Sequence, residues 1–225
     1  MSDISVIVEG PTEQKFIKEI LAPELAPKNI FLTATTLRKP GENGGDVKFS
    51  RVKNHIGKFL KQRADTCVTL MLDYYGIHET KTDVWPGYKD STQQPAHSQK
   101  HSFLIEATKA EIVRLFPPKY NPQSRFIPYF SMHEIEALYF SNTTILAQTT
   151  DIKEKKITGI LRECGEPENI NNNRNTAPSK RLEALCPSFQ KTSTGLAIAQ
   201  AIGISAMRTA CPLFNAWITQ MENMR

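Results

Sequence analysis

The sequence lacks any long apolar run and any targeting pattern. No stretch approaches the roughly 18 consecutive apolar residues that a membrane-spanning helix needs. The opening residues MSDISVIVEG have no basic segment followed by an apolar run and a small-residue cleavage site, so they do not form a signal peptide. We therefore expect a soluble protein of the cytoplasm with no membrane partner.

Cysteine is scarce and carries no pattern. The four cysteines are scattered through the chain and form no C-x-x-C pair; they are Cys67, Cys164, Cys186 and Cys211. Neither a zinc knuckle nor a disulfide framework is indicated by this spacing. Internal repeats and low-complexity tracts are absent as well.

The usual nucleotide-binding and hydrolase motifs are also missing. EGPTEQK at residues 9–15 superficially resembles a phosphate loop, but it lacks the spacing G-x-x-x-x-G-K, which excludes a Walker ATP site. Neither G-x-G-x-x-G nor G-x-S-x-G occurs. His133-Glu134 begins like the zinc motif H-E-x-x-H, but residue 137 is alanine, so that match fails.

The composition that remains is that of an ordinary globular protein. The chain has 225 residues, of which 40% are hydrophobic and 23% charged, so it can bury a real core in one large domain or in a domain with a smaller appendage. The formal charge of +5 weakly favours polyanionic partners such as nucleic acid.

Short apolar strands alternate with helical patterns over the first two-thirds of the chain. Strands are predicted at 4–8, 30–37, 67–72 and 126–131, and helices at 11–25, 50–63, 103–116 and from about His133. Pro128 indicates an edge position for the last strand. This alternation predicts parallel βαβ units, and hence a mostly parallel sheet with helices on both faces.

The rest of the chain is predicted to be loop or helix. The segments 39–46, 77–101 and 166–178 are polar and rich in turn residues. The long segment 77–101 is either a lid over a site or plain surface. Residues 151–225 contain no convincing strand, and helices are expected at 152–163, 178–186, 195–202 and 212–223. We therefore divide the chain into an α/β domain, 1–150, and a helical subdomain, 151–225.

Acidic residues follow the predicted strands. Glu9 ends the first strand, Glu13 lies in the next helical turn, and Asp73 ends the third. The last strand leads into Glu134 and Glu136. Because ligands bind at the carboxyl ends of parallel strands, these acids are expected to meet, and clustered carboxylates suit Mg²⁺ or Mn²⁺.

Each of these acids also has a simpler interpretation. Glu13 occupies the position of a capping-box glutamate, and that role is as probable from the sequence alone. Asp73 suits a turn cap, and Glu134 and Glu136 suit a solvated helix face. Glu9 has fewer alternatives, since a carboxylate directly after a buried strand is costly unless it is paired.

Several motifs together resemble an uncharacterised bacterial family, domain-of-unknown-function family 4276. They are VEGPTEQKFI, MLDYYG, FIPYFSMHEIEALYF, APSKRL and CPLFNAWI, and they span nearly the whole chain. The resemblance implies a TOPRIM-like fold, the Mg²⁺-binding α/β fold of topoisomerases, primases and OLD-type (overcoming lysogenization defect) nucleases.

By this resemblance, Glu9, Asp73 and Glu136 are the metal ligands, and Glu13 binds a second ion or acts as general base. Lys180 is a loose match to a lysine that stabilises the phosphoryl transition state in those nucleases. The second aspartate of their Asp-x-Asp motif is replaced by Tyr75, which leaves either one metal or an inactive site, and His133 or Glu134 is a candidate to compensate.

The resemblance implies a Mg²⁺-dependent nuclease, the effector of a bacterial defence module with a separate ABC-type ATPase. The helix predicted at 50–63 is basic, and it would then guide a nucleic-acid backbone through Arg51, Lys53, Lys58 and Lys61. Most of these side chains also suit a solvated helix face. Tyr74 and Tyr75 are candidates to stack on a base, with core burial of at least one the simpler expectation. The alternative is a non-catalytic subunit that docks such an ATPase or nucleic acid on a TOPRIM-like scaffold.

Overall fold

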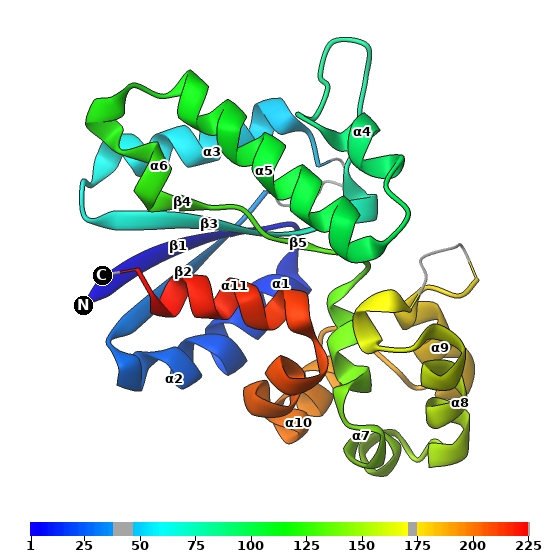
Figure 1. Ribbon diagram of the computed structural model, residues 1–225. Coiled ribbons are helices and arrows are strands. Elements are labelled where there is room, and N and C mark those ends of the chain that lie inside the picture. Colours follow the sequence, from blue (N-terminus) through cyan, green and yellow to red (C-terminus); the bar gives the residue numbers. More distant parts are fainter. Residues whose placement is uncertain (38–46, 171–174, 225) are drawn as a thin grey trace.

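A computed structural model of the protein describes residues 1–37, 47–170 and 175–224 (Figure 1). Within these residues the fold is α/β, with one sheet whose strands all pair in parallel. The strands are β1 (Ser2–Val8), β2 (Ile30–Thr36), β3 (Thr66–Asp73), β4 (Phe126–Ile127) and β5 (Phe130–Ser131). Their order is β2-β1-β3-β4, and β5 pairs with β3 further along. The parallel sheet predicted from the alternating pattern is confirmed.

The central position of β1 explains its apolar sequence. It pairs with β2 on one side and with β3 on the other, so that Val6 lies between Ala34 and Thr69. A parallel strand inside a sheet is covered on both faces, and the stretch from Ile4 to Val8 is accordingly buried throughout.

Pro128 divides the last predicted strand in two. Phe126 and Ile127 pair with Val68 and Thr69, and pairing resumes only at Phe130. Proline has no N–H to donate to a neighbouring strand, so it is tolerated at the margin of a sheet. Since β4 is terminal in the strand order, the edge position predicted from Pro128 is confirmed.

Helices cover both faces of the sheet (Figure 1). One face carries α3 (Phe49–Gln62), α4 (Tyr88–Thr92), α5 (His97–Leu115) and α6 (Pro122–Arg125). The other carries α1 (Pro11–Phe16), a π-helical stretch (Ile17–Leu21), α2 (Ala22–Leu25) and α11 (Pro212–Glu222).

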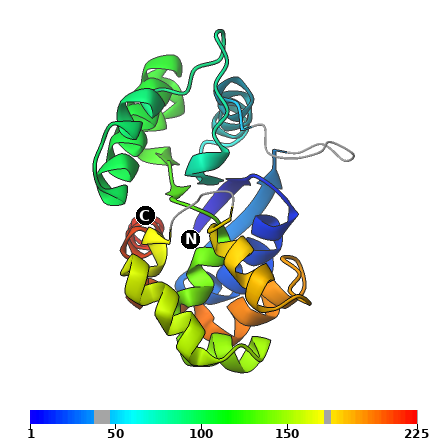
Figure 2. The same cartoon turned by 90° about the vertical axis from the view of Figure 1, so that its right-hand side faces the viewer.

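The remaining helices gather beyond one end of the sheet (Figure 2). They are α7 (Thr143–Thr150), α8 (Glu154–Cys164), α9 (Pro178–Leu185) and α10 (Thr194–Ala210). Short 3₁₀ helices lie at Ala26–Lys28, Tyr74–Gly76, Pro118–Tyr120, Ile135–Ser141 and Pro167–Asn169. The helical C-terminal third predicted from the sequence is confirmed, and α10 runs past its predicted end, with a break at Gly203 (φ 77°).

Each face of the sheet has its own hydrophobic core. The core below β1 joins Ile4 and Val6 to side chains of α10 and α11, among them Trp217. The indole N–H of Trp217 donates to Thr69 Oγ1 on β3 at 2.7 Å. The last third of the chain therefore shares a core with the sheet, and the division at residue 150 stays a prediction.

A buried guanidinium ties three elements together on the other face. Arg125 of α6 donates to the carbonyl of Thr66 at the start of β3, and to that of Leu60 near the end of α3. It also donates to Tyr120 and Arg63. Carbonyls at a helix C-terminus have no intrahelical partner, so Arg125 satisfies groups that burial would otherwise leave without one.

Two sequence expectations need correction. Segment 77–101 is not a continuous loop, because it contains α4 and the first turn of α5, which begins at His97. The helix expected from His133 begins at Ile135 and is 3₁₀ rather than α. The predicted loop 39–46 lies outside the described residues. None of the described helices is by itself long and apolar enough to cross a bilayer, although α10 and α11 pass that test together across a 95° bend.

Candidate functional site

The first and third strands bring two acids to the carboxyl edge of the sheet. Glu9 follows β1, and Asp73 is the last residue of β3. The 3₁₀ turn after Asp73 folds back so that a Cβ on Gly76 would lie 2.8 Å from Glu9 Oε2 and 3.4 Å from the Asp73 Cβ. The adjacency expected of Glu9 and Asp73 is therefore present in the fold.

Glu13 has the capping role that its position suggests, and its charge also acts on Asp73. Its Oε2 accepts from the backbone N–H of Gly10 at 3.0 Å, which is the capping-box contact at the start of α1. Burial, and then the negative charges of Glu13, Glu9, Glu136 and Glu134, hold the pKa of Asp73 well above its usual range.

Glu136 is the most deeply buried of these acids. Its side chain is 1% exposed, and its Oε1 has no hydrogen-bond partner among the described residues. The nearest cation is Lys191, whose Nζ lies 3.4 Å from that oxygen. Burial outweighs the attraction of Lys191 and raises the pKa of Glu136 to about 7.

Glu134 is held by hydrogen bonds rather than left open. It accepts from the backbone N–H of Ser179 and from Lys191 Nζ, both at 2.9 Å. Burial acts to raise the pKa of Glu134, but Lys191 and these hydrogen bonds outweigh it, and the pKa falls below its ordinary value. Ser179 belongs to the APSKRL motif, so this motif contacts the site through its backbone.

The cation beside the acids is Lys191, which the sequence did not single out. Burial acts to lower the pKa of Lys191, and the charges of Glu136, Glu134 and Asp73 reverse this and raise it. Lys180, the lysine expected from the resemblance, is 52% exposed and pairs with Glu183 at 2.6 Å. Lys191 lies in the polar stretch between α9 and α10, where no motif marks it.

Aromatic rings adjoin the acid cluster. Tyr75 stacks on His133 with ring centroids 5.4 Å apart and planes at 10°. His97, the first residue of α5, meets His133 edge-on at 4.8 Å, and its Nδ1 lies 3.2 Å from Asn169 Oδ1. His133 is 1% exposed, and neither ring nitrogen has a hydrogen-bond partner among the described residues. Burial lowers the pKa of His133 to about 3, so its ring is neutral at ordinary pH.

The donor chemistry of the cluster suits a hard divalent cation. The acids of the cluster offer only carboxylate oxygens, and one buried oxygen of Glu136 lacks a hydrogen bond. In the part of the chain that the structure describes, however, no three His, Cys, Asp or Glu side chains are placed to hold one ion. Glu13 and Glu134 are each held by hydrogen bonds, so an ion could engage them only by exchanging those bonds.

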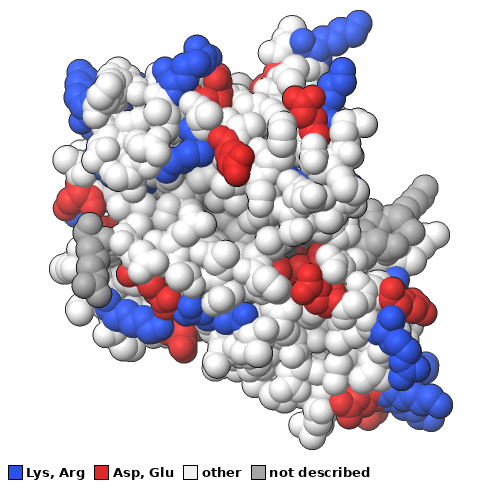
Figure 3. All heavy atoms as spheres, in the orientation of Figure 1, with Lys and Arg blue, Asp and Glu red and all other residues white. Residues whose placement is uncertain are grey.

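The basic residues of α3 lie away from this edge. Lys53, Lys58 and Lys61 line a hollow beside Phe116, between α3 and the end of α5. Figure 3 shows Lys and Arg in separate patches rather than in one continuous field. The contact expected of Arg51, Lys53, Lys58 and Lys61 with a nucleic-acid backbone stays a prediction, and only a long substrate would reach both places.

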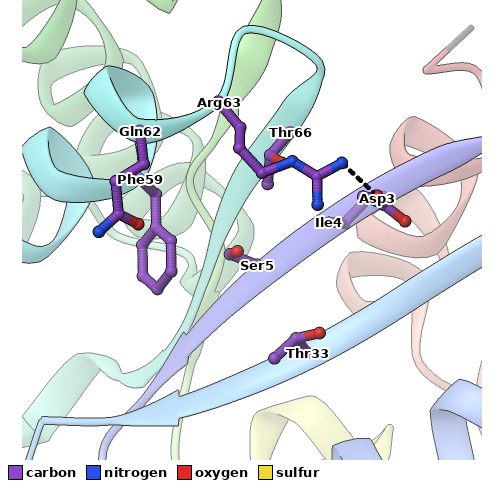
Figure 4. A pocket seen from close by; sticks show the side chains of 8 residues that line it. All are labelled: Asp3, Ile4, Ser5, Thr33, Phe59, Gln62, Arg63 and Thr66. Carbon is purple, nitrogen blue, oxygen red and sulfur yellow. Dashed lines mark hydrogen bonds and ion pairs between the residues drawn. The ribbon is translucent and has the colours of Figure 1, made fainter.

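A second hollow lies toward the amino ends of the strands (Figure 4). The ring of Phe59 and the guanidinium of Arg63 border it, and Arg63 pairs with Asp3 at 2.9 Å. Ser5, Thr33 and Thr66 contribute hydroxyl groups from three neighbouring strands. Because these positions precede the carboxyl ends of the strands, this hollow is separate from the acid cluster.

The fold and the cluster define an α/β protein with a parallel sheet and acids at its carboxyl edge. The model of the family described as "domain of unknown function (DUF4276)" matches residues 8–222. The chain belongs to this family, as its motifs predicted. No curated protein and no solved structure matches it.

Proposed function

We propose that the protein is a Mg²⁺-dependent phosphodiester hydrolase that acts on nucleic acid, with a TOPRIM-like active site at the carboxyl edge of the sheet. The observation that carries the proposal is the environment of Asp73. Four other acids, Glu9, Glu13, Glu134 and Glu136, lie close enough for their negative charges to add to burial in raising the pKa of its carboxyl group. Such a cluster repels itself unless protons or cations intervene, and a divalent ion is the common solution.

Glu9, Asp73 and Glu136 are the residues that would hold the ion, with Glu13 as the general base or as a further ligand. A bound Mg²⁺ polarises the phosphoryl oxygen and lowers the pKa of its water. Lys191 is better placed than Lys180 to neutralise charge on the phosphate, because its ammonium group already lies among the acids. The proposal includes a cytoplasmic location and a separate ABC-type ATPase as partner.

The second candidate function is a non-catalytic binding subunit of such an ATPase. Two observations favour it. By the resemblance to OLD-type nucleases, Tyr75 replaces a second aspartate, and no three acids converge on one point among the described side chains. A protein of this kind would keep the acid cluster for structure and use its surface for docking.

Titration calorimetry with Mg²⁺ and with Mn²⁺ separates the two functions. The wild type should bind the ion, and Glu9→Gln and Asp73→Asn should each abolish binding while leaving the circular dichroism spectrum unchanged. Glu106→Gln, on an exposed part of α5, removes one negative charge away from the cluster and is the matched control. Absence of ion binding by the wild type would favour the non-catalytic subunit.

Cleavage is then tested on single-stranded and duplex DNA and RNA, with either ion and with EDTA. Hydrolysis that requires the ion and disappears in Asp73→Asn supports the hydrolase. If the protein binds Mg²⁺ but cleaves nothing, the assay is repeated with the ATPase of a neighbouring gene.

A further inference from the structure

An exposed aromatic ring stands beside the acid cluster. Tyr74 and Tyr75 follow Asp73 directly, but only Tyr74 is buried, at 1% exposure, whereas Tyr75 is 40% exposed. In the described chain, Tyr75 is one of five large hydrophobic residues that are exposed. Packing in the core therefore explains why residue 74 is a tyrosine, but it does not explain the exposed face of the Tyr75 ring.

The ring of Tyr75 is held in place from within. It stacks almost parallel on His133, with ring centroids 5.4 Å apart, and it meets Tyr74 edge-on at 5.0 Å. Tyr74 is fixed in turn by a 2.8 Å hydrogen bond between its hydroxyl and Ser91. Aromatic contacts of these types are each favourable by about 0.5–1.5 kcal/mol beyond simple burial, so Tyr75 presents a rigid and pre-oriented surface.

His133 has little structural reason to be an imidazole. Both of its nitrogens are buried without a partner in the described structure, which costs about 1–3 kcal/mol for each unsatisfied group. An apolar ring would support the protein at no such cost. A flat ring that is both buried and stacked on a half-exposed tyrosine makes sense as the underside of a binding platform.

The position of this platform points to its ligand. Tyr75 lies two residues after Asp73 and next to Gly76, against which the Glu9 carboxylate packs. Lys191, the cation of the cluster, lies on the acids of the same site. An aromatic face beside a place for a divalent ion and an ammonium group matches a nucleotide, whose base is flat and whose phosphate is anionic.

We propose that the open face of Tyr75 stacks on a nucleobase next to the scissile phosphate, and that the protein therefore acts on single-stranded nucleic acid. This inference rests on the proposed function and deepens it by naming the substrate class. In a duplex both faces of each base are already covered by its neighbours, so only an unpaired base offers its face to Tyr75. Stacking needs no particular base, and the preference is for strandedness rather than sequence.

The tyrosine position can report on its own ligand. Both native tryptophans, Trp85 and Trp217, are 1% exposed, so Tyr75→Trp introduces the single exposed indole among the described residues. In EDTA, single-stranded oligonucleotides should quench this indole, and a duplex of the same sequence should not. Phe31→Trp is the matched control, because Phe31 is 42% exposed and lies near the amino end of β2, whereas Tyr75 follows the carboxyl end of β3.

Affinity gives an independent measurement. Anisotropy of a labelled oligonucleotide, again in EDTA, should show binding weakened by roughly 5- to 150-fold in Tyr75→Ala, the range expected for one base–aromatic stack. Tyr75→Phe keeps the ring and should bind within about twofold of wild type. DNA and RNA oligonucleotides are both tried, and preference for either supports the proposal.

Equal quenching of the Tyr75→Trp and Phe31→Trp indoles would overturn the stacking proposal, as would unchanged affinity in Tyr75→Ala. These experiments contain no divalent ion, so they do not depend on the hydrolase proposal. Quenching at residue 75 without any Mg²⁺ binding would support the stacking proposal and overturn the hydrolase proposal. If the protein binds Mg²⁺ and cleaves nucleic acid but the changes at residue 75 have no effect, the hydrolase proposal stands and the stacking proposal is wrong.

Discussion

Glu9 packs its carboxylate against the α-carbon of Gly76, so closely that a Cβ at residue 76 would lie 2.8 Å from Glu9 Oε2. Real Cβ atoms do not approach an oxygen to that distance, and glycine is therefore required if Glu9 is to stay where it is. The contact joins the turn after β3 to the residue after β1. It makes Gly76 a residue of the carboxylate cluster although it carries no functional group.

Gly76→Ala should therefore act on the site more than on the fold. The atom that must move is the end of a flexible glutamate side chain, so we expect a loss of stability of about 1 kcal/mol and a drop of at least tenfold in Mg²⁺ affinity. Gly159→Ala on α8 is the control, since a Cβ there meets nothing within 4 Å. Urea unfolding and calorimetry measure the two effects, and unchanged Mg²⁺ affinity in Gly76→Ala would place Glu9 outside the metal site.

Removal of Lys191 should destabilise the protein when no divalent ion is present. Lys191→Met leaves the partly buried Glu134 and the buried Glu136 without their cation. We expect this to cost about 1–2 kcal/mol in EDTA, a figure reduced because Lys191 is 40% exposed. Added Mg²⁺ should recover part of this loss. Lys180→Met removes a lysine paired only with exposed Glu183, and it should stay within about 0.5 kcal/mol of wild type. Similar urea midpoints for the two variants would contradict the assignment of Lys191.

The stability of the protein should contain a pH-dependent contribution from Glu168. Its carboxylate accepts from the backbone N–H groups of Leu213 and Phe214 at the start of α11, yet burial outweighs these bonds and raises its pKa to about 7. A carboxyl group with a raised folded pKa binds a proton that the unfolded chain has already lost. Its contribution to stability is therefore full below about pH 4.5 and falls as pH rises toward 7.

Glu168→Gln should weaken this pH dependence. Glutamine does not titrate, so the stability of the variant relative to wild type should rise between pH 5 and pH 8, by at most roughly 3 kcal/mol. Urea unfolding at the two pH values measures the difference. Asp73, Glu136 and His133 titrate in both proteins and cancel in the comparison. Parallel pH profiles for variant and wild type would show that Glu168 stays ionised in the fold.

The isolated segment 1–150 should not fold. Without α10 and α11, one face of the sheet would expose Ile4 and Val6, and Thr69 would lose the indole of Trp217. The full chain should unfold in a single transition when fluorescence and circular dichroism are compared. Trp217→Phe removes the 2.7 Å hydrogen bond and part of a buried ring, and should cost at least about 1–2 kcal/mol. A soluble, cooperatively folded 1–150 fragment would establish the division at residue 150.

Much of the fold follows from local patterns in the sequence. Buried parallel strands are short apolar runs, so β1, β2 and β3 were predicted to within two residues of their ends. The break at Pro128 and the early start of α5 were less visible. Residues 97–102 contain few apolar side chains, and the helix is stabilised there by tertiary contacts, such as the edge-on contact of His97 with His133, rather than by an apolar stripe.

The site was predictable where a strand end marks a residue, and unpredictable elsewhere. Glu9 and Asp73 follow apolar runs, and parallel strands must bring their ends to one edge. Lys191 comes from a polar stretch between two helices, and only the packing of α9 and α10 carries it to Glu134 and Glu136. Lys180 looked better because it belongs to a motif, but that motif contacts the site through the backbone N–H of Ser179.

Arg125 has one further consequence. Its guanidinium donates to carbonyl oxygens of α3, of the start of β3 and of the segment before α6. If any one of these segments detached, some of the guanidinium N–H groups would lose their acceptor, and the other two segments could not replace it. Leu60 and Thr66 lie near each other in the sequence and Tyr120 lies far from both, yet the carbonyl groups of all three bind this one side chain. The three segments should therefore open together, and their slowly exchanging amide protons should exchange with solvent at one common rate.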